Sequence, residues 1–180
     1  MQKLRRIALA AAALGTAAAL ATPWAARADQ SKQPQNLPEN IQVPEGSQLF
    51  LVAHAFGTQN YTCDVSTNNW SAATPDADLF VDGKLVIEHT AGPTWTHNDK
   101  SSVGHPDPLD PDAKKVAPSP NGDDNIPWLR LGKFTVNTGP GELFPTKWIQ
   151  RLYTHGGVHP ATCTTGTASV PYRAEYWFYR

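Results

Sequence analysis

The stretch Ala77-Asp78-Leu79-Phe80-Val81-Asp82-Gly83-Lys84-Leu85-Val86-Ile87-Glu88-His89 decides the fold class. Two apolar runs flank Asp82-Gly83, a dipeptide that favours the two-residue turn of a β-hairpin. In this register Val81 opposes Lys84 and Phe80 opposes Leu85. Regular alternation then puts Phe80, Leu85, Ile87 and His89 on one face, and Leu79, Val81 and Val86 on the other. The sequence therefore predicts an antiparallel hairpin with His89 on an apolar face.

Further strands are predicted on both sides of this hairpin. Residues 48–56 are apolar, and Gly57 separates them from residues 59–65, which predicts two paired strands. Apolar or alternating runs predict strands at residues 94–96, 127–135, 146–154 and 170–179. Residues 104–125 are rich in proline and aspartate and are expected to form one long surface loop. The chain is therefore predicted to be all-β, a single-domain sandwich or barrel of mostly antiparallel strands.

The N-terminus has the features of a secretory signal peptide. Lys3, Arg5 and Arg6 precede an apolar, Ala-rich run, and Ala26-Arg27-Ala28 is a small-x-small cleavage site. We expect residues 1–28 to be the signal peptide, residues 29–46 a polar, Pro-containing arm, and residues 47–180 a single β domain. This organisation predicts a periplasmic or extracellular protein, and Arg5-Arg6 leaves both general secretory and twin-arginine export open.

The composition of the chain argues against two classes of partner, nucleic acids and a membrane crossed by a helix. The whole chain has a net charge of −1, but the expected signal peptide carries four basic residues and no acid, which leaves 11 basic against 16 acidic residues. An excess of acidic residues argues against a nucleic-acid partner. After residue 28 no apolar run approaches the ~20 residues of a membrane-spanning helix, so no span is expected once the signal is cleaved.

Cys63 and Cys163 are the two cysteines of the chain. Because an oxidising compartment allows two thiols to pair, we predict a disulfide between them. It would close a loop of 163 − 63 = 100 residues. A crosslink of that size stabilises the folded state by about 4 to 5 kcal/mol in the chain-entropy description.

Catalytic chemistry could centre on His89. A serine nucleophile needs a histidine base that a carboxylate orients, and Asp99 and Ser102 follow His89 in the sequence. The chain has no Gly-x-Ser-x-Gly motif, however, and a serine at position 102 is equally typical of a turn. A catalytic set of His89, Asp99 and Ser102 and a hydrogen-bonded structural His89 both remain open.

Gln150 and Arg151 place a polar residue on each face of the strand predicted at residues 146–154. A buried Arg151 would need a carboxylate such as Glu88 or Glu175, or it could hold an anionic ligand through its two-pronged guanidinium. Since tryptophan also lines ligand clefts, the predicted ligand-binding residues are His89, Trp95, Gln150 and Arg151.

The six histidines do not have the spacing of a metal site. The chain contains no His-x-His, no His-Glu-x-x-His and no calcium loop, so no metal ligand and no cofactor are predicted. A metal-binding protein stays as an alternative function because the histidines and the acidic loop could still meet in space. The histidines are His54, His89, His97, His105, His155 and His159.

Five short motifs together resemble a known family. They are His89-Thr90-Ala91-Gly92-Pro93-Thr94-Trp95, Ile126-Pro127-Trp128-Leu129, Ile149-Gln150-Arg151-Leu152-Tyr153-Thr154-His155-Gly156-Gly157, Tyr61-Thr62-Cys63 and Val170-Pro171-Tyr172-Arg173-Ala174-Glu175-Tyr176. In order and spacing, residues 47–179 resemble the small secreted proteins of domain of unknown function 3455. The resemblance implies export and brings no activity, substrate or cofactor. The chain departs from the family after Asp99, where Lys100-Ser101-Ser102 replaces the usual Asp-Gly-Ser.

The sequence thus favours an exported β-domain that binds a small molecule or an envelope component, or that has a structural role in the envelope. An extracytoplasmic hydrolase with His89 as general base is the second hypothesis, and a metal-binding protein is the third.

Overall fold

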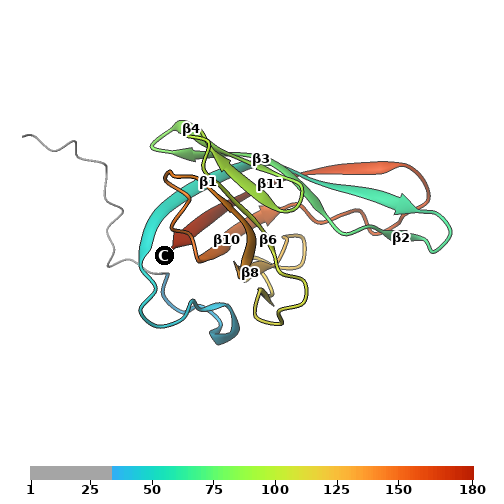
Figure 1. The fold of residues 1–180 in the computed structure, drawn as a ribbon. Helices are drawn as coiled ribbons and strands as arrows, with labels where there is room; N and C mark the ends of the chain where they lie inside the picture. The colour runs from blue at the N-terminus through green and yellow to red at the C-terminus, as the bar shows by residue number, and fades with distance from the viewer. Residues whose placement is uncertain (1–33) are drawn as a thin grey trace, which may run out of the picture.

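The structure, a computed structural model, describes residues 34–180 and contains one antiparallel, 11-stranded sheet (Figure 1). The expected signal peptide lies outside the described residues. A short 3-10 helix, η1 (Glu39–Ile41), precedes the sheet. The strands are β1 (Leu49–Asp64), β2 (Asn69–Trp70), β3 (Thr74–Val81), β4 (Lys84–Thr90), β5 (Thr94–His97), β6 (Ser102–Pro106), β7 (Lys114–Ala117), β8 (Trp128–Gly132), β9 (Phe134–Thr138), β10 (Trp148–Gly156) and β11 (Thr167–Tyr179). The predicted all-β, single-domain fold is confirmed.

The sheet curls into a half-barrel. Its order is β7-β8-β10-β11-β1-β3-β4-β5-β6-β9, with β2 beside β1. Strands β8 and β9 lie near opposite ends of this order, yet Lys133 alone separates them in the chain. The sheet must therefore bend until its two ends approach each other, and at this point the Asp107 amide donates to the Lys133 carbonyl at 3.0 Å. The single strand predicted at residues 127–135 is wrong, because Lys133, at φ +52°, turns the chain between two strands.

The β3–β4 hairpin is confirmed, but its faces are not those expected. Asp82 and Gly83 both have positive φ, as a type I′ turn requires, and Val81 opposes Lys84. Moving away from the turn, Phe80 pairs with Leu85 and the next residue, Leu79, pairs with Ile87. Val86 therefore has no partner in β3 and is an extra residue in β4. This β-bulge reverses the alternation. The buried face therefore carries Ala77, Leu79, Ile87 and His89, whereas Phe80 and Leu85 lie on the outer face.

β1 is one continuous strand of 16 residues, which corrects the two strands expected around Gly57. Gly57 pairs with Tyr172 on one side and with Ala77 on the other. A Cβ atom at this position would overlap the Asp76 carbonyl and Ala77, so glycine is required for the close approach of β3 rather than for a turn. The loop expected at residues 104–125 is also interrupted, since it contains β7 and the end of β6.

The two faces of the sheet have separate apolar clusters. The inner cluster fills part of the half-barrel and includes Leu79, Ile87, Trp95, Tyr176 and Phe178. The outer cluster is smaller: η1 packs Ile41 against Ala117, Trp128 and Leu152, on the outer side of β7, β8 and β10. The expected N-terminal arm is thus in contact with the sheet where the structure describes it.

The predicted disulfide is confirmed at the far end of the longest strands. β1, β3 and β11 run together beyond the body of the half-barrel toward β2 (Figure 1). There Cys63 is bonded to Cys163, with Cα atoms 5.5 Å apart, and the Cys63 amide donates to the Gly166 carbonyl. The bond fastens the end of β1 to the segment that leads into β11.

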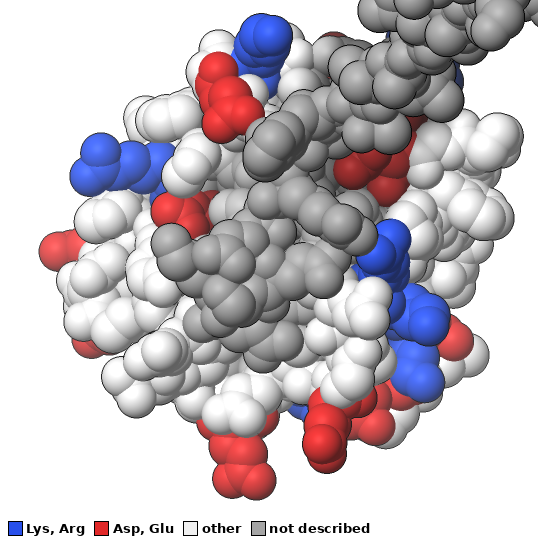
Figure 2. Space-filling model, turned by 90° about the vertical axis from the view of Figure 1, so that its left-hand side faces the viewer, with Lys and Arg blue, Asp and Glu red and all other residues white. Residues whose placement is uncertain are grey.

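Over the described part of the face in Figure 2, acidic and basic side chains are interspersed.

Candidate functional site

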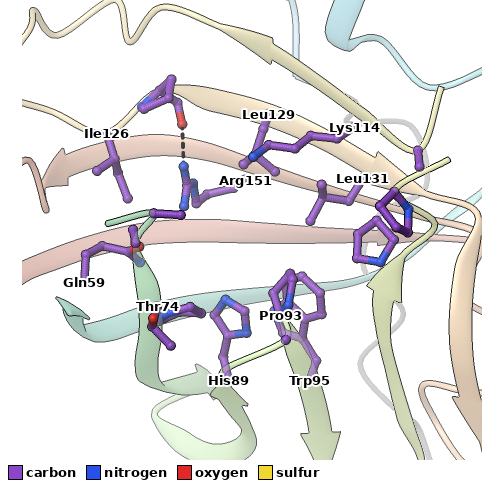
Figure 3. Close-up of a pocket in the computed structure, with 18 of the residues that line it drawn as sticks. Gln59, Thr74, His89, Pro93, Trp95, Lys114, Ile126, Leu129, Leu131 and Arg151 are labelled. Atoms are coloured by element: carbon purple, nitrogen blue, oxygen red, sulfur yellow. Dashed lines mark hydrogen bonds between the residues drawn. The ribbon is translucent and has the colours of Figure 1, made fainter. Parts of the chain in front are cut away.

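The interior of the half-barrel holds a cavity of about 720 Å³. One wall comes from β8 and β10, which contribute Leu129, Leu131 and Arg151, and the opposite wall comes from β4 and β5, which contribute His89 and Trp95 (Figure 3). The volume lies within the range of ligand pockets, roughly 300 to 1,000 Å³. The cavity therefore brings together three of the four predicted ligand-binding residues.

Paired residues of β11, β1, β3, β4 and β5 form one row across the sheet beside this space. Gly57 pairs with Ala77, and Ala77 pairs with His89, so two small side chains lie between the rings of Tyr172 and His89 in one row across the sheet. The next pair in the row is His89 with Trp95. Because cross-strand partners point to the same face, the rings of Tyr172, His89 and Trp95 share the inner face of the sheet.

His89 is held as a neutral ring. It is 2% exposed, its ring stacks on Trp95 with centroids 4.2 Å apart, and its edge meets Tyr176 at 5.1 Å. Nδ1 donates to the Thr94 carbonyl at 2.9 Å, because a carbonyl can only accept, so Nε2 is the unprotonated nitrogen. Burial lowers the pKa of His89 to about 3. The hydrogen bond to Thr94 raises this pKa in part, and the positive charge of Arg151 lowers it further. At neutral pH its ring offers an acceptor rather than a charge.

Arg151 enters the cavity from the opposite wall, and no acidic side chain in residues 34–180 forms an ion pair with it. Its Nη2 donates to the Pro127 carbonyl at 2.9 Å, and its Nε is buried with no hydrogen-bond partner (Figure 3). The expected ion pair with Glu88 or Glu175 is wrong. Glu88 is exposed, and Glu175 accepts from Trp177 Nε1 at 3.0 Å. Both acids alternate with buried residues of the inner face, so they point to the outer face of the sheet, whereas Arg151 points inward.

Buried tyrosines surround the guanidinium. The Tyr61 hydroxyl donates to the Gly157 carbonyl at 2.6 Å, and the hydroxyls of Tyr172 and Tyr176 are 3.2 Å apart. Burial raises the pKa of all three, although the charge of Arg151 lowers each in part. The tyrosines are consequently neutral near pH 7 and do not compensate the positive charge.

Gln150 does not belong to the cavity. It is 0% exposed on the outer face, where its Nε2 donates to the Ile41 carbonyl at 2.6 Å and its Oε1 accepts from the Tyr179 hydroxyl at 2.7 Å. Successive residues of a strand point to opposite faces, which separates it from Arg151. Gln150 connects η1 to the sheet.

His89, Asp99 and Ser102 do not contact one another. Asp99 accepts from Ser101 Oγ at 2.6 Å and from the Glu142 amide at 2.7 Å, and His97 Nδ1 lies 3.1 Å from it. The Ser102 hydroxyl accepts a hydrogen bond from Thr96 Oγ1 at 3.5 Å. Hydrogen bonds from Ser101, followed by the one from Glu142, hold the pKa of Asp99 well below its usual range. The three residues are thus placed in separate surroundings, and Asp99 orders the loop between β5 and β6.

Gln59 is a site residue that sequence reasoning missed. It is 2% exposed, it lines the cavity, and its Nε2 has no hydrogen-bond partner. The signal was present, because Ala53, Ala55, Gly57 and Gln59 alternate along one face of β1. The expectation of a turn at Gly57 hid that alternation.

Residues 34–180 contain no group of three His, Cys, Asp or Glu side chains that could hold a metal ion. Within the same residues, no helix is both long enough and apolar enough to cross a membrane.

Fold and site together define a single-domain, disulfide-linked β half-barrel with an internal cavity. The chain belongs to the family described as protein of unknown function DUF3455, which matches residues 81–180. That match includes His89, Trp95 and Arg151. Neither a curated protein nor a solved structure shows significant similarity to the chain.

Proposed function

We propose that this protein is an exported binding module that holds a small organic molecule inside the half-barrel. The observation that carries the proposal is the cavity itself. Its walls are mainly apolar, from Ile126, Leu129 and Leu131, and a few polar side chains reach it from several strands. Ligand sites are typically built in this way, with apolar walls for affinity and few polar groups for orientation.

The environment of His89 supports binding over hydrolysis. A general base works best when its pKa is near the pH of the reaction, whereas burial lowers the pKa of His89 to about 3. Neither Asp99 nor Ser102 is among its contacts. His89 is better suited to accept a hydrogen bond at Nε2 and to stiffen the wall through its stack on Trp95.

Binding in the cavity can be tested with Nile red, a neutral dye that fluoresces in apolar surroundings. The purified chain should bind it with saturable fluorescence. Leu129→Trp, which fills the cavity from β8, should abolish the signal, whereas Leu85→Trp on the outer face of β4 should leave it unchanged. A signal that is equal in both variants, with folding verified by circular dichroism, would refute the cavity as the binding site.

Export is supported by the basic and apolar start of the chain and by the disulfide, which oxidising compartments favour. Fractionation of cells that express the full chain should place the protein in the periplasm or the medium, with Asp29 as its first residue. Recovery of the uncleaved chain in the cytoplasm would contradict export.

A further inference from the structure

Arg151 carries a positive charge into the cavity with no ion-pair partner among the described residues. Within residues 34–180, no carboxylate lies within 4.0 Å of its guanidinium. The groups that do interact with it are a carbonyl oxygen, neutral tyrosines and neutral His89. An unpaired charge in partly buried surroundings is unfavourable. An anionic group bound in the cavity beside Arg151 would therefore be stabilised by the guanidinium charge.

Other hydrogen-bond donors at the cavity also lack acceptors. Gln59 Nε2, Trp95 Nε1 and Arg151 Nε are all buried and unpartnered, and all three residues line the cavity. Gln59 and Trp95 are 2% and 1% exposed, so bulk water does not replace the missing acceptors. Buried polar atoms without partners are rare in folded proteins, and three of the six among the described residues belong to side chains that line this cavity.

Three further charged residues line the cavity, and neither of the two carboxylates among them forms an ion pair with Arg151. Lys114 on β7 is exposed, and Asp107 and Asp110 belong to the proline-rich segment between β6 and β7. Arg151, in contrast, lies opposite the stacked rings of His89 and Trp95 (Figure 3). An acceptor beside Arg151 would therefore leave the rest of the ligand against Ile126, Leu129 and Leu131.

We infer that the ligand is a compact apolar carboxylic acid, whose carboxylate binds Arg151 and whose apolar part fills the cavity. The inference rests on the proposed binding function. A planar carboxylate matches the planar guanidinium, whose terminal nitrogens can donate two parallel hydrogen bonds to it. Gln59 adds a buried polar side chain to the same lining.

The test uses naphthoate as the probe and naphthamide as its neutral counterpart, titrated into the purified chain by isothermal calorimetry. Naphthoate should bind at least 10-fold more tightly than naphthamide, because charge-assisted hydrogen bonds contribute roughly 1.5 to 3 kcal/mol. Arg151→Met should remove this preference. Arg151→Lys should retain only part of it, since an ammonium lacks the two-pronged geometry. Gln59→Leu should weaken naphthoate roughly 3- to 10-fold.

The control is Arg173→Met, the same substitution at an exposed residue on β11, which should leave naphthoate binding unchanged. Equal affinity of naphthoate and naphthamide, with Nile red still bound, overturns the carboxylate inference and leaves the binding function standing. Tighter binding of naphthyl phosphate than of naphthoate also overturns it, in favour of a phosphate ester. If neither Nile red nor any naphthalene compound binds the folded chain, both proposals fail.

Discussion

Gln150 and Arg151 are neighbours on β10, and they are surrounded in opposite ways. Outside the half-barrel, both polar ends of Gln150 are hydrogen-bonded and Ile41 closes the space above the sheet. Inside, Arg151 reaches a cavity of about 720 Å³ and keeps an unpartnered Nε. A satisfied buried amide strengthens the fold, whereas a cation without an ion-pair partner beside a cavity is unfavourable until an acceptor reaches it. The two faces of one sheet therefore differ, the outer one being packed and hydrogen-bonded and the inner one carrying the cavity in which we propose binding.

The outer face should give the largest loss of stability. Ile41 is 0% exposed and its cluster is small, so Ile41→Ala should lower the free energy of unfolding by about 4 kcal/mol through the cavity it leaves. Urea denaturation measures this loss, and Nile red binding by the folded fraction should not change. The exposed neighbour Glu39→Ala is the control. A loss below about 1 kcal/mol would contradict a structural role for η1.

On the inner face, His89 makes stability depend on pH. Its pKa is about 3 when folded and near 6.5 when unfolded, so below pH 6.5 the unfolded chain takes up a proton that the folded chain refuses. Stability should fall by about 3 kcal/mol between pH 6.5 and pH 4, at about 1.4 kcal/mol per pH unit. His89→Gln should remove this part of the decline, as measured by denaturation at each pH. The exposed His155→Gln should keep it, and equal slopes in both variants would be inconsistent with a neutral His89.

Gln150→Ala should be destabilising by about 2 kcal/mol. It leaves the Ile41 carbonyl without its donor and the Tyr179 hydroxyl without its acceptor, both in buried surroundings. Thermal unfolding measures the change, and the exposed Gln48→Ala provides the matched control. Nile red binding should survive in the folded protein. Loss of binding would mean that Gln150 serves the cavity after all.

Arg151→Met should have the smallest effect on stability and the opposite sign. Removing an unbalanced charge should raise the free energy of unfolding by about 1 kcal/mol, and the Pro127 carbonyl can be hydrated because Pro127 is exposed. The same thermal measurement on Arg173→Met should show no change. Destabilisation by Arg151→Met would contradict the contrast between the two faces, since Arg151 would then be as structural as Gln150.

Much of the fold was readable from local pattern. The Asp82-Gly83 turn fixed one hairpin, and the alternation of Tyr172, Ala174, Tyr176 and Phe178 on β11 is the alternation of the buried face. The errors arose where a single residue broke the period of two. Val86 reverses the faces of β4, and Lys133 sends the chain from one end of the sheet to the other. Composition gives no warning of either, because a bulge is decided by pairing with a neighbouring strand.

The sequence by itself determined the β class, the disulfide and the residue types of the candidate site, since turn chemistry, alternation and cysteine pairing are local or compositional properties. It also placed Gln150 and Arg151 on opposite faces. Only the tertiary structure decided which face is hollow and that His89 and Trp95 stand opposite Arg151. That outcome depends on the curl of the whole sheet, which sums the twist and bulges of many strands and is not recorded in any one segment.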